Sequence, residues 1–467
     1  MRKLLAVIGF LVLLIGCGGD DATDVKVIVE QPSGGNSGNT DANSVSYVWD
    51  SSVTSQVIRL SASASWSVKS DDHCKNWCYP VKSSGTSDKI VLWVSPNITN
   101  KARSGKVTVQ LGGKKQEISV SQPAFTGDLD TYDYHLPVVF HVMYHNKSDK
   151  KQNPDKSQFT KILDAVNKLY AANNMHIVFE MAKYDDDGEE LEEPGIIRKK
   201  VDFKEYDPHE FLKDEDYAED VQNLKKFINI FVFCFAQSSD KSTTLGLTTL
   251  PILPTAYPDP KDLLNETDAA NDYAYLTTPF GVCINNEFID VWQDEGTIKP
   301  TYIVSTVAHE LGHYVGLLHT FSENECEEDD GCDDTHISDY ENYLAYIQKY
   351  QNDEIAKGRD PNSFNIKELG TRTDCKTGEE FIADNILDYA YTIGDVFTAD
   401  QKKRTRHVLK YGALTPGPKL IDYNTTGIVT KSTNKSSQRA AASRPGMVQT
   451  DPCPKVPVNR LPQIGLK

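Results

Sequence analysis

The chain has 467 residues, of which 39% are hydrophobic and 25% are charged, which is typical of a globular protein with two or three domains. The formal net charge is −18 and the sequence contains no basic stripe, so nucleic acid is excluded as a partner. The acidic residues are spread along the chain and indicate a well-solvated surface.

Residues 1–16 have the features of an export signal peptide. Arg2 and Lys3 precede an apolar run that is too short to cross a membrane, because a spanning helix needs about 20 residues. Gly16-Cys17 at the end of this run resembles a bacterial lipobox. The resemblance implies that Cys17 is lipidated and anchors the mature chain to the outer membrane or cell surface. The alternative is an ordinary secretory signal with a chance cysteine.

The next two segments differ in composition. Residues 17–44 are rich in Gly, Ser, Asn, Asp and Thr, so they cannot form a core and we expect a flexible tether. Residues 45–123 instead contain short runs of alternating polar and apolar residues, separated by turn signals. This pattern predicts an all-β sandwich of the immunoglobulin type.

The β-rich segment also has a family resemblance. Trp66, the Trp77-Cys78 pair and the closing Ser121-Gln122-Pro123 resemble BACON domains. The resemblance implies contact with glycans or mucin, although the strand pattern itself contains no sign of a sugar site. A spacer that positions the rest of the chain is the alternative interpretation.

Strand and helix patterns alternate over residues 128–420, which predicts an α/β domain. Residues 136–144 and 229–235 are apolar runs typical of buried strands, and residues 155–172 have helical periodicity. The polar composition of residues 421–467 predicts a C-terminal tail with little structure.

The segment TYIVSTVAHELGHYVGLLHTF, residues 301–321, has the strongest functional signal. His309 and His313 are four residues apart on a helical pattern, so both imidazoles lie on one side of the helix. Gly316 then allows the chain to leave the helix in a left-handed conformation and to return His319 as a third nitrogen ligand. Three neutral imidazoles leave the fourth position of a zinc ion open, which is typical of a catalytic site.

Glu310 stands beside the first of these histidines. Its position predicts a general base that deprotonates a zinc-bound water as the water attacks a carbonyl carbon. The alternative is a buried amphipathic helix whose histidines only satisfy hydrogen bonds, but this alternative does not require the complete spacing of the motif.

The spacing H-E-x-x-H-x-x-G-x-x-H over residues 309–319 is the metzincin signature, and HELGHYVGLLHTF resembles the pappalysin (cytophagalysin-like) branch. The resemblance implies a zinc metalloendopeptidase with an edge strand at residues 245–251, along which a peptide substrate lies. It also implies a Met-turn at residues 385–389. Leu387 stands there at the methionine position, and Tyr389 matches a tyrosine that donates to the oxyanion; a plain core tyrosine is the alternative.

The same resemblance implies a disulfide between Cys332 and Cys375; the other cysteine pairings stay open. The carboxylates between Glu325 and Asp334 are oxygen ligands of the kind that calcium prefers. Their spacing is not that of an EF-hand, however, so a solvated acidic loop is the favoured interpretation.

The sequence therefore predicts a surface-anchored zinc endopeptidase whose substrates are proteins or peptides. Two alternatives remain, namely an inactive or latent adhesin that binds glycans and a zinc hydrolase of non-peptide amides. An intact Glu310 favours the peptidase, because a protein that has lost its catalytic activity does not need a general base.

Overall fold

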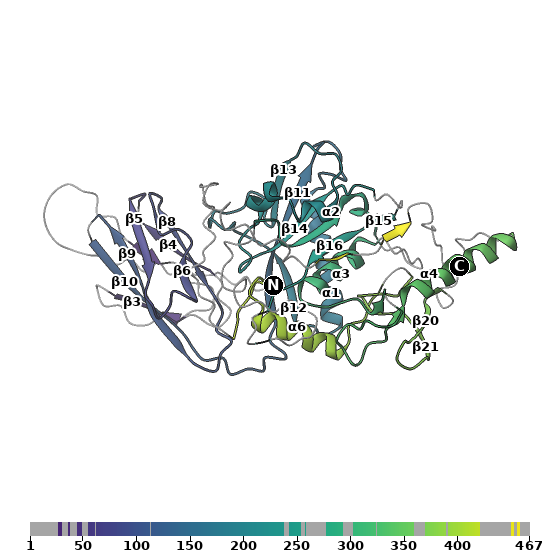
Figure 1. Cartoon of the computed structure of the whole chain (residues 1–467). Helices are drawn as coiled ribbons and strands as arrows, with labels where there is room; N and C mark the ends of the chain where they lie inside the picture. Colours follow the sequence, from purple (N-terminus) through teal and green to yellow (C-terminus); the bar gives the residue numbers. More distant parts are fainter. Residues whose placement is uncertain are drawn as a thin grey trace, which may run out of the picture. The chain divides into compact units, whose positions relative to one another are not determined.

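The computed structural model contains two compact units: the first comprises residues up to Leu129 together with residues 186–189 and 418–426, and the second comprises the rest (Figure 1). The described residues are 55–60, 62–112, 114–237, 242–253, 257, 277–292, 302–323, 325–358, 369–388 and 391–420, with short strands at 27–29, 36–37, 44–48, 450–452 and 455–457. The signal segment with Cys17 and most of the tail lie outside these residues. Within them, no helix is long and apolar enough to cross a membrane.

The first unit contains two β-sheets, with strand orders β1-β4-β8-β6 and β2-β3-β10-β9-β5-β7. Its strands are β1 (Val27–Val29), β2 (Asn36–Ser37), β3 (Ser44–Val48), β4 (Ser55–Leu60), β5 (Trp66–Ser70), β6 (Cys78–Pro80), β7 (Ser84–Gly85), β8 (Lys89–Val94), β9 (Arg103–Leu111) and β10 (Lys114–Gln122).

One apolar core joins these two sheets, because Ile90 and Leu92 of one sheet cluster with Val107 and Val109 of the other. Buried and more exposed residues alternate along β10, as the sequence pattern predicts. The expected all-β sandwich is confirmed. Trp66 and Trp77 are only 6% and 4% exposed and belong to its core.

The second unit is α/β. Its elements are β11 (Tyr134–Tyr144), α1 (Lys156–Ala172), β12 (Ile177–Met181), β13 (Ile196–Lys200), α2 (Pro208–Phe211), η1 (Glu215–Asp220), β14 (Ile228–Phe233), β15 (Ser242–Thr244), β16 (Gly246–Thr249), β17 (Val282–Asn285), η3 (Asn286–Phe288), α3 (Ile303–Tyr314), β18 (Phe321–Ser322), β19 (Ser338–Asp339), α4 (Tyr340–Ala356), β20 (Thr371–Thr373), β21 (Glu380–Ile382), α6 (Ala399–Tyr411), β22 (Thr450–Pro452) and β23 (Lys455–Pro457).

The main sheet of this unit has the order β12-β11-β14-β17-β16-β22, and β13 also pairs with β11. The pairs β11–β12, β11–β14 and β14–β17 are parallel, whereas β16 runs antiparallel to β17. Helix α1 connects the parallel strands β11 and β12, as such a crossover requires. Its Tyr170 hydroxyl donates to the carbonyl of Ala308 at 2.9 Å and so ties α1 to α3. The predicted α/β order is confirmed.

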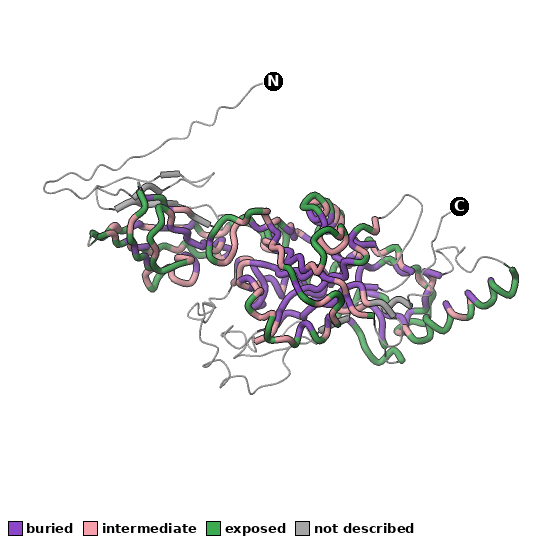
Figure 2. The backbone as a smooth tube through the Cα atoms, turned by 90° about the horizontal axis from the view of Figure 1, so that it is seen from above, coloured by how far each residue is buried: buried purple, intermediate pink, exposed green. Residues whose placement is uncertain are grey.

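Helix α4 and the small ladders β18–β19 and β20–β21 follow α3. Figure 2 shows α4 largely in the green of exposed residues. Its buried residues form one stripe: Tyr343, Ile347, Gln351 and Glu354. Helix α6, the last one among the described residues, begins with the capping box that the sequence predicts, formed by Thr398 and Gln401.

The C-terminal tail contains two strands that its composition did not predict. β22 pairs with β16, and β23 pairs with β15. The edge strand expected at residues 245–251 is therefore β16, but its outer edge is not bare.

Candidate active site

Helix α3 ends in a Schellman motif at Gly316, which has a φ of 98°. The amide of Gly316 donates to the carbonyl of His313 at 2.8 Å, and the amide of Leu317 donates to that of Gly312 at 3.0 Å. A residue with a Cβ is disfavoured at such a φ. The chain therefore turns back at Gly316 and brings His319 to the histidines of the helix, as the sequence predicts.

The three imidazoles converge through their Nε2 atoms. His313 Nε2 lies 2.9 Å from His309 Nε2 and 3.0 Å from His319 Nε2. Among the described residues, these three form the only group of three or more His, Cys, Asp or Glu side chains close enough to share a metal ion. A tetrahedral ion with bonds of about 2.1 Å separates its ligands by about 3.4 Å, which is close to the observed spacing.

Hydrogen bonds fix the tautomer of the two helix histidines. His309 Nδ1 lies 2.7 Å from the carbonyl oxygen of Ile386, and His313 Nδ1 lies 2.8 Å from that of Leu317. A carbonyl oxygen only accepts, so each Nδ1 carries the proton and each Nε2 presents a lone pair. Lone pairs facing each other at 2.9 Å repel unless a cation lies between them.

Protonation of a ring is a poor source of that cation, because burial disfavours the imidazolium. Burial lowers the pKa of His313 to about 4. Burial, and then the charge of neighbouring imidazoles, holds the pKa values of His309 and His319 well below the usual range. Two buried imidazoles and the partly buried His319, all neutral and with their Nε2 atoms converging, fit a divalent metal ion.

Glu310 is fully buried between α3 and β16. The Thr248 hydroxyl of β16 donates to Oε2 of Glu310 and lies 3.2 Å from the backbone oxygen of the same residue. Gly246 backs directly onto the carboxylate, since a Cβ added there would lie 2.6 Å from Glu310 Oε1. The sequence identified this strand but not these two contacts; the only signal was a glycine and a small hydroxyl residue in alternate positions.

The turn at Leu387 packs against the metal-binding helix. Leu387 is fully buried, and its Cδ2 atom lies 3.2 Å from the position that a Cβ would take on Gly312. The preceding residue, Ile386, supplies the carbonyl that orients His309. The expected Met-turn position therefore lies beside the triad. Tyr389 lies outside the described residues, so its role stays a prediction.

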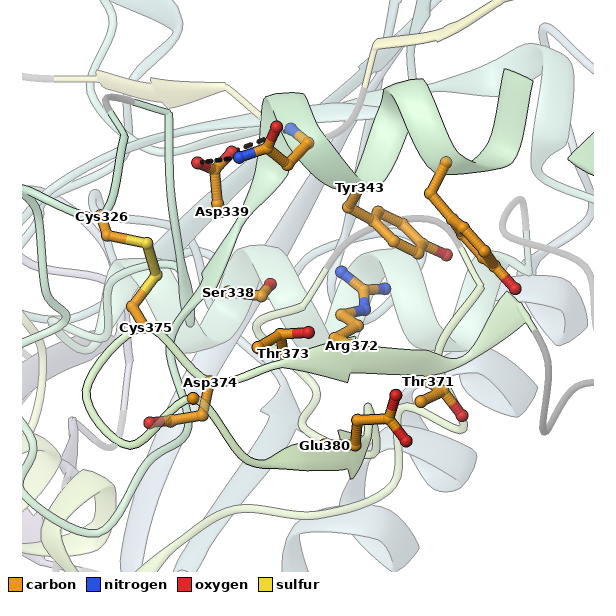
Figure 3. Close-up of a pocket in the computed structure, with 13 residues that line it drawn as sticks. Cys326, Ser338, Asp339, Tyr343, Thr371, Arg372, Thr373, Asp374, Cys375 and Glu380 are labelled. Carbon is orange, nitrogen blue, oxygen red and sulfur yellow. Dashed lines mark hydrogen bonds between the residues drawn. A yellow bond between two sulfur atoms is a disulfide. The ribbon is translucent and has the colours of Figure 1, made fainter. Parts of the chain in front are cut away.

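Two contacts hold this turn in place. Asn385 and Gln401 of α6 exchange amide hydrogen bonds of 2.8 and 3.1 Å. Asp388 forms a buried ion pair with Arg372, whose Nη1 lies 2.8 Å from Oδ1. The Arg372 guanidinium stacks on the ring of Tyr343 at 3.8 Å, next to a cavity of about 580 Å³ between α4 and the β20–β21 ladder (Figure 3).

The predicted disulfide between Cys332 and Cys375 is wrong. Cys375 is bonded to Cys326 (Figure 3), and Cys332 is a buried free thiol. The Asp330 carboxylate accepts from the amide of Cys332 and from the hydroxyl of Thr335. This tight turn places Cys332 in the interior. The acidic loop nevertheless remains tied to the segment before the turn at Leu387.

Two family models match the chain. Residues 292–410 match Peptidase_M43, described as pregnancy-associated plasma protein-A, and residues 64–123 match BACON, described as a putative N-terminal binding domain. The first range contains the three histidines and Glu310. The chain carries a pappalysin-type metallopeptidase domain. A BACON domain precedes this pappalysin-type domain, and both resemblances seen in the sequence are thereby confirmed at the family level.

Solved structures are similar over part of the chain. Mature mirolysin of Tannerella forsythia, in complex with a cleaved peptide, shares 18% identity over 58% of this chain and 90% of its own, with a TM-score of 0.37. A promirolysin mutant of the same organism shares 18% identity over 61% and 83%, with a TM-score of 0.40. A Bacteroides thetaiotaomicron protein shares 18% over 24% and 100%, with a TM-score of 0.15. No curated protein matches. The assignment rests on the family models and the site geometry.

Proposed function

We propose that the pappalysin-type domain is a zinc-dependent endopeptidase that hydrolyses peptide bonds in proteins or peptides. The observation that carries the proposal is the convergence of three neutral Nε2 atoms beside a buried carboxylate, between α3 and the strand β16. Zinc held by His309, His313 and His319 supplies Lewis acidity, which polarises a carbonyl group and lowers the pKa of water.

Glu310 is the general base of the proposed reaction. Its carboxylate takes the proton of the attacking water and later delivers it to the amine that leaves. The Thr248 hydroxyl holds this carboxylate from the side of β16. The Thr248 side chain is thus a positioning group, because it acts through Glu310.

The peptide backbone would pair with the outer edge of β16, which lies alongside α3 with Gly246 against Glu310. Pairing with a strand edge recognises the main chain, since the hydrogen bonds come from backbone groups. We further propose that Tyr389, two residues after Leu387, donates to the oxyanion of the tetrahedral intermediate. Leu387 provides the apolar support of the turn, with a volume close to that of methionine.

We also propose that lipidated Cys17 anchors the chain to the outer membrane or cell surface. The support is the sequence alone: Arg2 and Lys3, the apolar run and Gly16 before the cysteine. Incorporation of a labelled fatty acid into the wild type, lost in Cys17→Ala, is the expected result. Equal labelling of both proteins would contradict the anchor.

The BACON domain is proposed to act as a spacer. Trp66 and Trp77, its candidate sugar platforms, are buried in the sandwich core and so cannot stack on a glycan. Retention of the wild-type ectodomain, residues 18–467, on a mucin column would contradict this proposal and favour the glycan-binding alternative.

The peptidase proposal is tested with the ectodomain, residues 18–467, loaded with zinc. Glu310→Ala should lower hydrolysis of a diverse peptide mixture by about 10²- to 10⁴-fold, the usual range for a general base, and keep a stoichiometric zinc content. Equal cleavage by the two proteins would rule out Glu310 as the base and with it the proposed mechanism.

A further inference from the structure

We propose that strand β22 (Thr450–Pro452) of the C-terminal tail occupies the peptide-binding edge of the main sheet, so that the chain blocks its own active site. The inference rests on the proposed function, because the edge of β16 is a peptide site only in an endopeptidase. It identifies the occupant of that edge as a segment of the same chain.

The pairing pattern carries this inference. Thr450 and Pro452 of β22 lie opposite Thr249 and Leu247 of β16, in an antiparallel ladder. The second ladder is also antiparallel and lies nearer the start of the β15–β16 segment: Lys455–Pro457 of β23 pairs with Ser242–Thr244 of β15, next to which Figure 1 shows a yellow C-terminal strand. The two ladders share one register: in all six pairs, each step forward along β15 and β16 is matched by one step backward along the tail, with no residue inserted or skipped between the ladders.

The segment between the two ladders on the β16 side is Leu245-Gly246. Gly246 is the residue that backs onto the Glu310 carboxylate. The two tail strands therefore pair with β15 of a separate two-stranded sheet and with β16 of the main sheet, before and after the point at which the chain passes the proposed general base. Cys453 and Pro454 of the tail lie outside the described residues.

A substrate and the tail would need the same backbone groups. One edge of β16 is paired with β17, so its other edge is the one available for an added strand. β22 pairs with that edge and ends the described strand order of the sheet. Because a strand edge pairs with one chain at a time, binding of a peptide substrate requires release of β22.

The sequence of the tail suits this position. Pro452 and Pro457 have no N–H group, and proline in sheets is confined to edge strands and strand ends. Proline also restricts φ, so less conformational entropy is lost when the segment becomes extended. The strand and the edge belong to one chain, so their pairing is intramolecular and needs less intrinsic affinity than the binding of a separate peptide.

The test compares three full ectodomains. Asp451→Pro/Lys455→Pro places prolines next to Pro452 and Pro454, so that neighbouring residues lack N–H groups and no orientation of the strand keeps its ladder. The control, Ser432→Pro/Ser436→Pro, has the same two changes at the same spacing within the preceding polar segment.

We expect the backbone amides of residues 242–249 that face the tail strands to exchange with solvent about tenfold faster in the tail variant than in the wild type or the control, whereas an amide bonded on the other side, such as that of Thr249 to Gly281, should not change. Hydrolysis of the peptide mixture should rise at least about tenfold in the same variant. A synthetic peptide of residues 447–460 should inhibit it competitively by raising KM.

Exchange at residues 242–249 decides the placement of the tail independently of activity. Equal exchange in all three proteins would overturn the inference. Faster exchange with an unchanged, measurable rate of hydrolysis would overturn the blocking role. Faster exchange with no hydrolysis by any zinc-loaded protein would uphold the tail placement and overturn the proposed peptidase function instead.

Discussion

The hydroxyl group of Thr248 contacts the Glu310 carboxylate. Thr248 donates to its carboxylate in a buried site, where a hydrogen bond to a charged group contributes about 1.5–3 kcal/mol. Thr248→Val keeps the shape of the side chain and removes the donor. We expect kcat to fall by about tenfold or more with KM nearly unchanged, since the side chain contacts Glu310 and the substitution leaves the backbone groups of β16 in place, and Thr248→Ser to recover most of the loss. A change in KM alone would assign Thr248 to substrate binding.

The Arg372–Asp388 ion pair is the second residue-scale feature of the site. Both side chains are buried beside Leu387, so removing one leaves an uncompensated charge. Arg372→Met should destabilise the second unit by about 3–5 kcal/mol, measured by denaturant unfolding. In Arg372→Met/Asp388→Leu the loss should be smaller than in the single variant. Strictly additive losses would show that the pair is not coupled.

At the scale of elements, the end of α3 controls the third metal ligand. Gly316→Ala strains a φ of 98° and shifts the chain that carries His319, so it should reduce both stability and zinc affinity. Gly358→Ala is the matched control, because Gly358 also has a positive φ, 69°, just beyond α4 and with open space around it. Both changes should cost about 1–2 kcal/mol of stability. Only Gly316→Ala should weaken zinc binding in a chelator competition; equal zinc affinity in both variants would contradict this role.

The sequence predicted the elements that follow from local periodicity. The spacing of His309 and His313, the glycine at the helix end and the buried strands are all encoded by neighbouring residues. The partner of Cys375 was not predictable in this way, because Cys326 and Cys332 lie in one loop whose internal turn decides which thiol faces outward. Thr248 was missed because its partner, Glu310, is distant in the sequence.

The strands of the tail escaped prediction for a different reason. Pairing with an exposed sheet edge uses backbone groups, so it requires neither an apolar face nor alternation of side chains. A polar segment with several prolines therefore has no strand signal, although residues 450–457 pair with β15 and β16.

At the scale of the whole molecule, the metal stabilises one of the two units. All three ligands belong to the second unit, so an ion bound only by the folded state, at 1,000 times its Kd, adds about 4 kcal/mol to that unit alone. Chelation should lower its melting temperature by roughly 10 °C, since 1 kcal/mol corresponds to about 2–4 °C at this size. The thermal unfolding transition of the BACON domain is the internal control, because that domain contains none of the three ligands and its melting temperature should not change. Equal shifts of both transitions in calorimetry would contradict a site confined to the second unit.

The most direct test of the account is hydrolysis of a diverse peptide mixture by zinc-loaded ectodomains, with the cut sites identified by mass spectrometry. Asp451→Pro/Lys455→Pro should cut faster than the wild type, and adding Glu310→Ala to that variant should abolish the cuts while zinc stays bound. If the tail variant is folded and zinc-loaded but cuts nothing, or if it cuts equally well without Glu310, the assignment of a Glu310-dependent endopeptidase is contradicted.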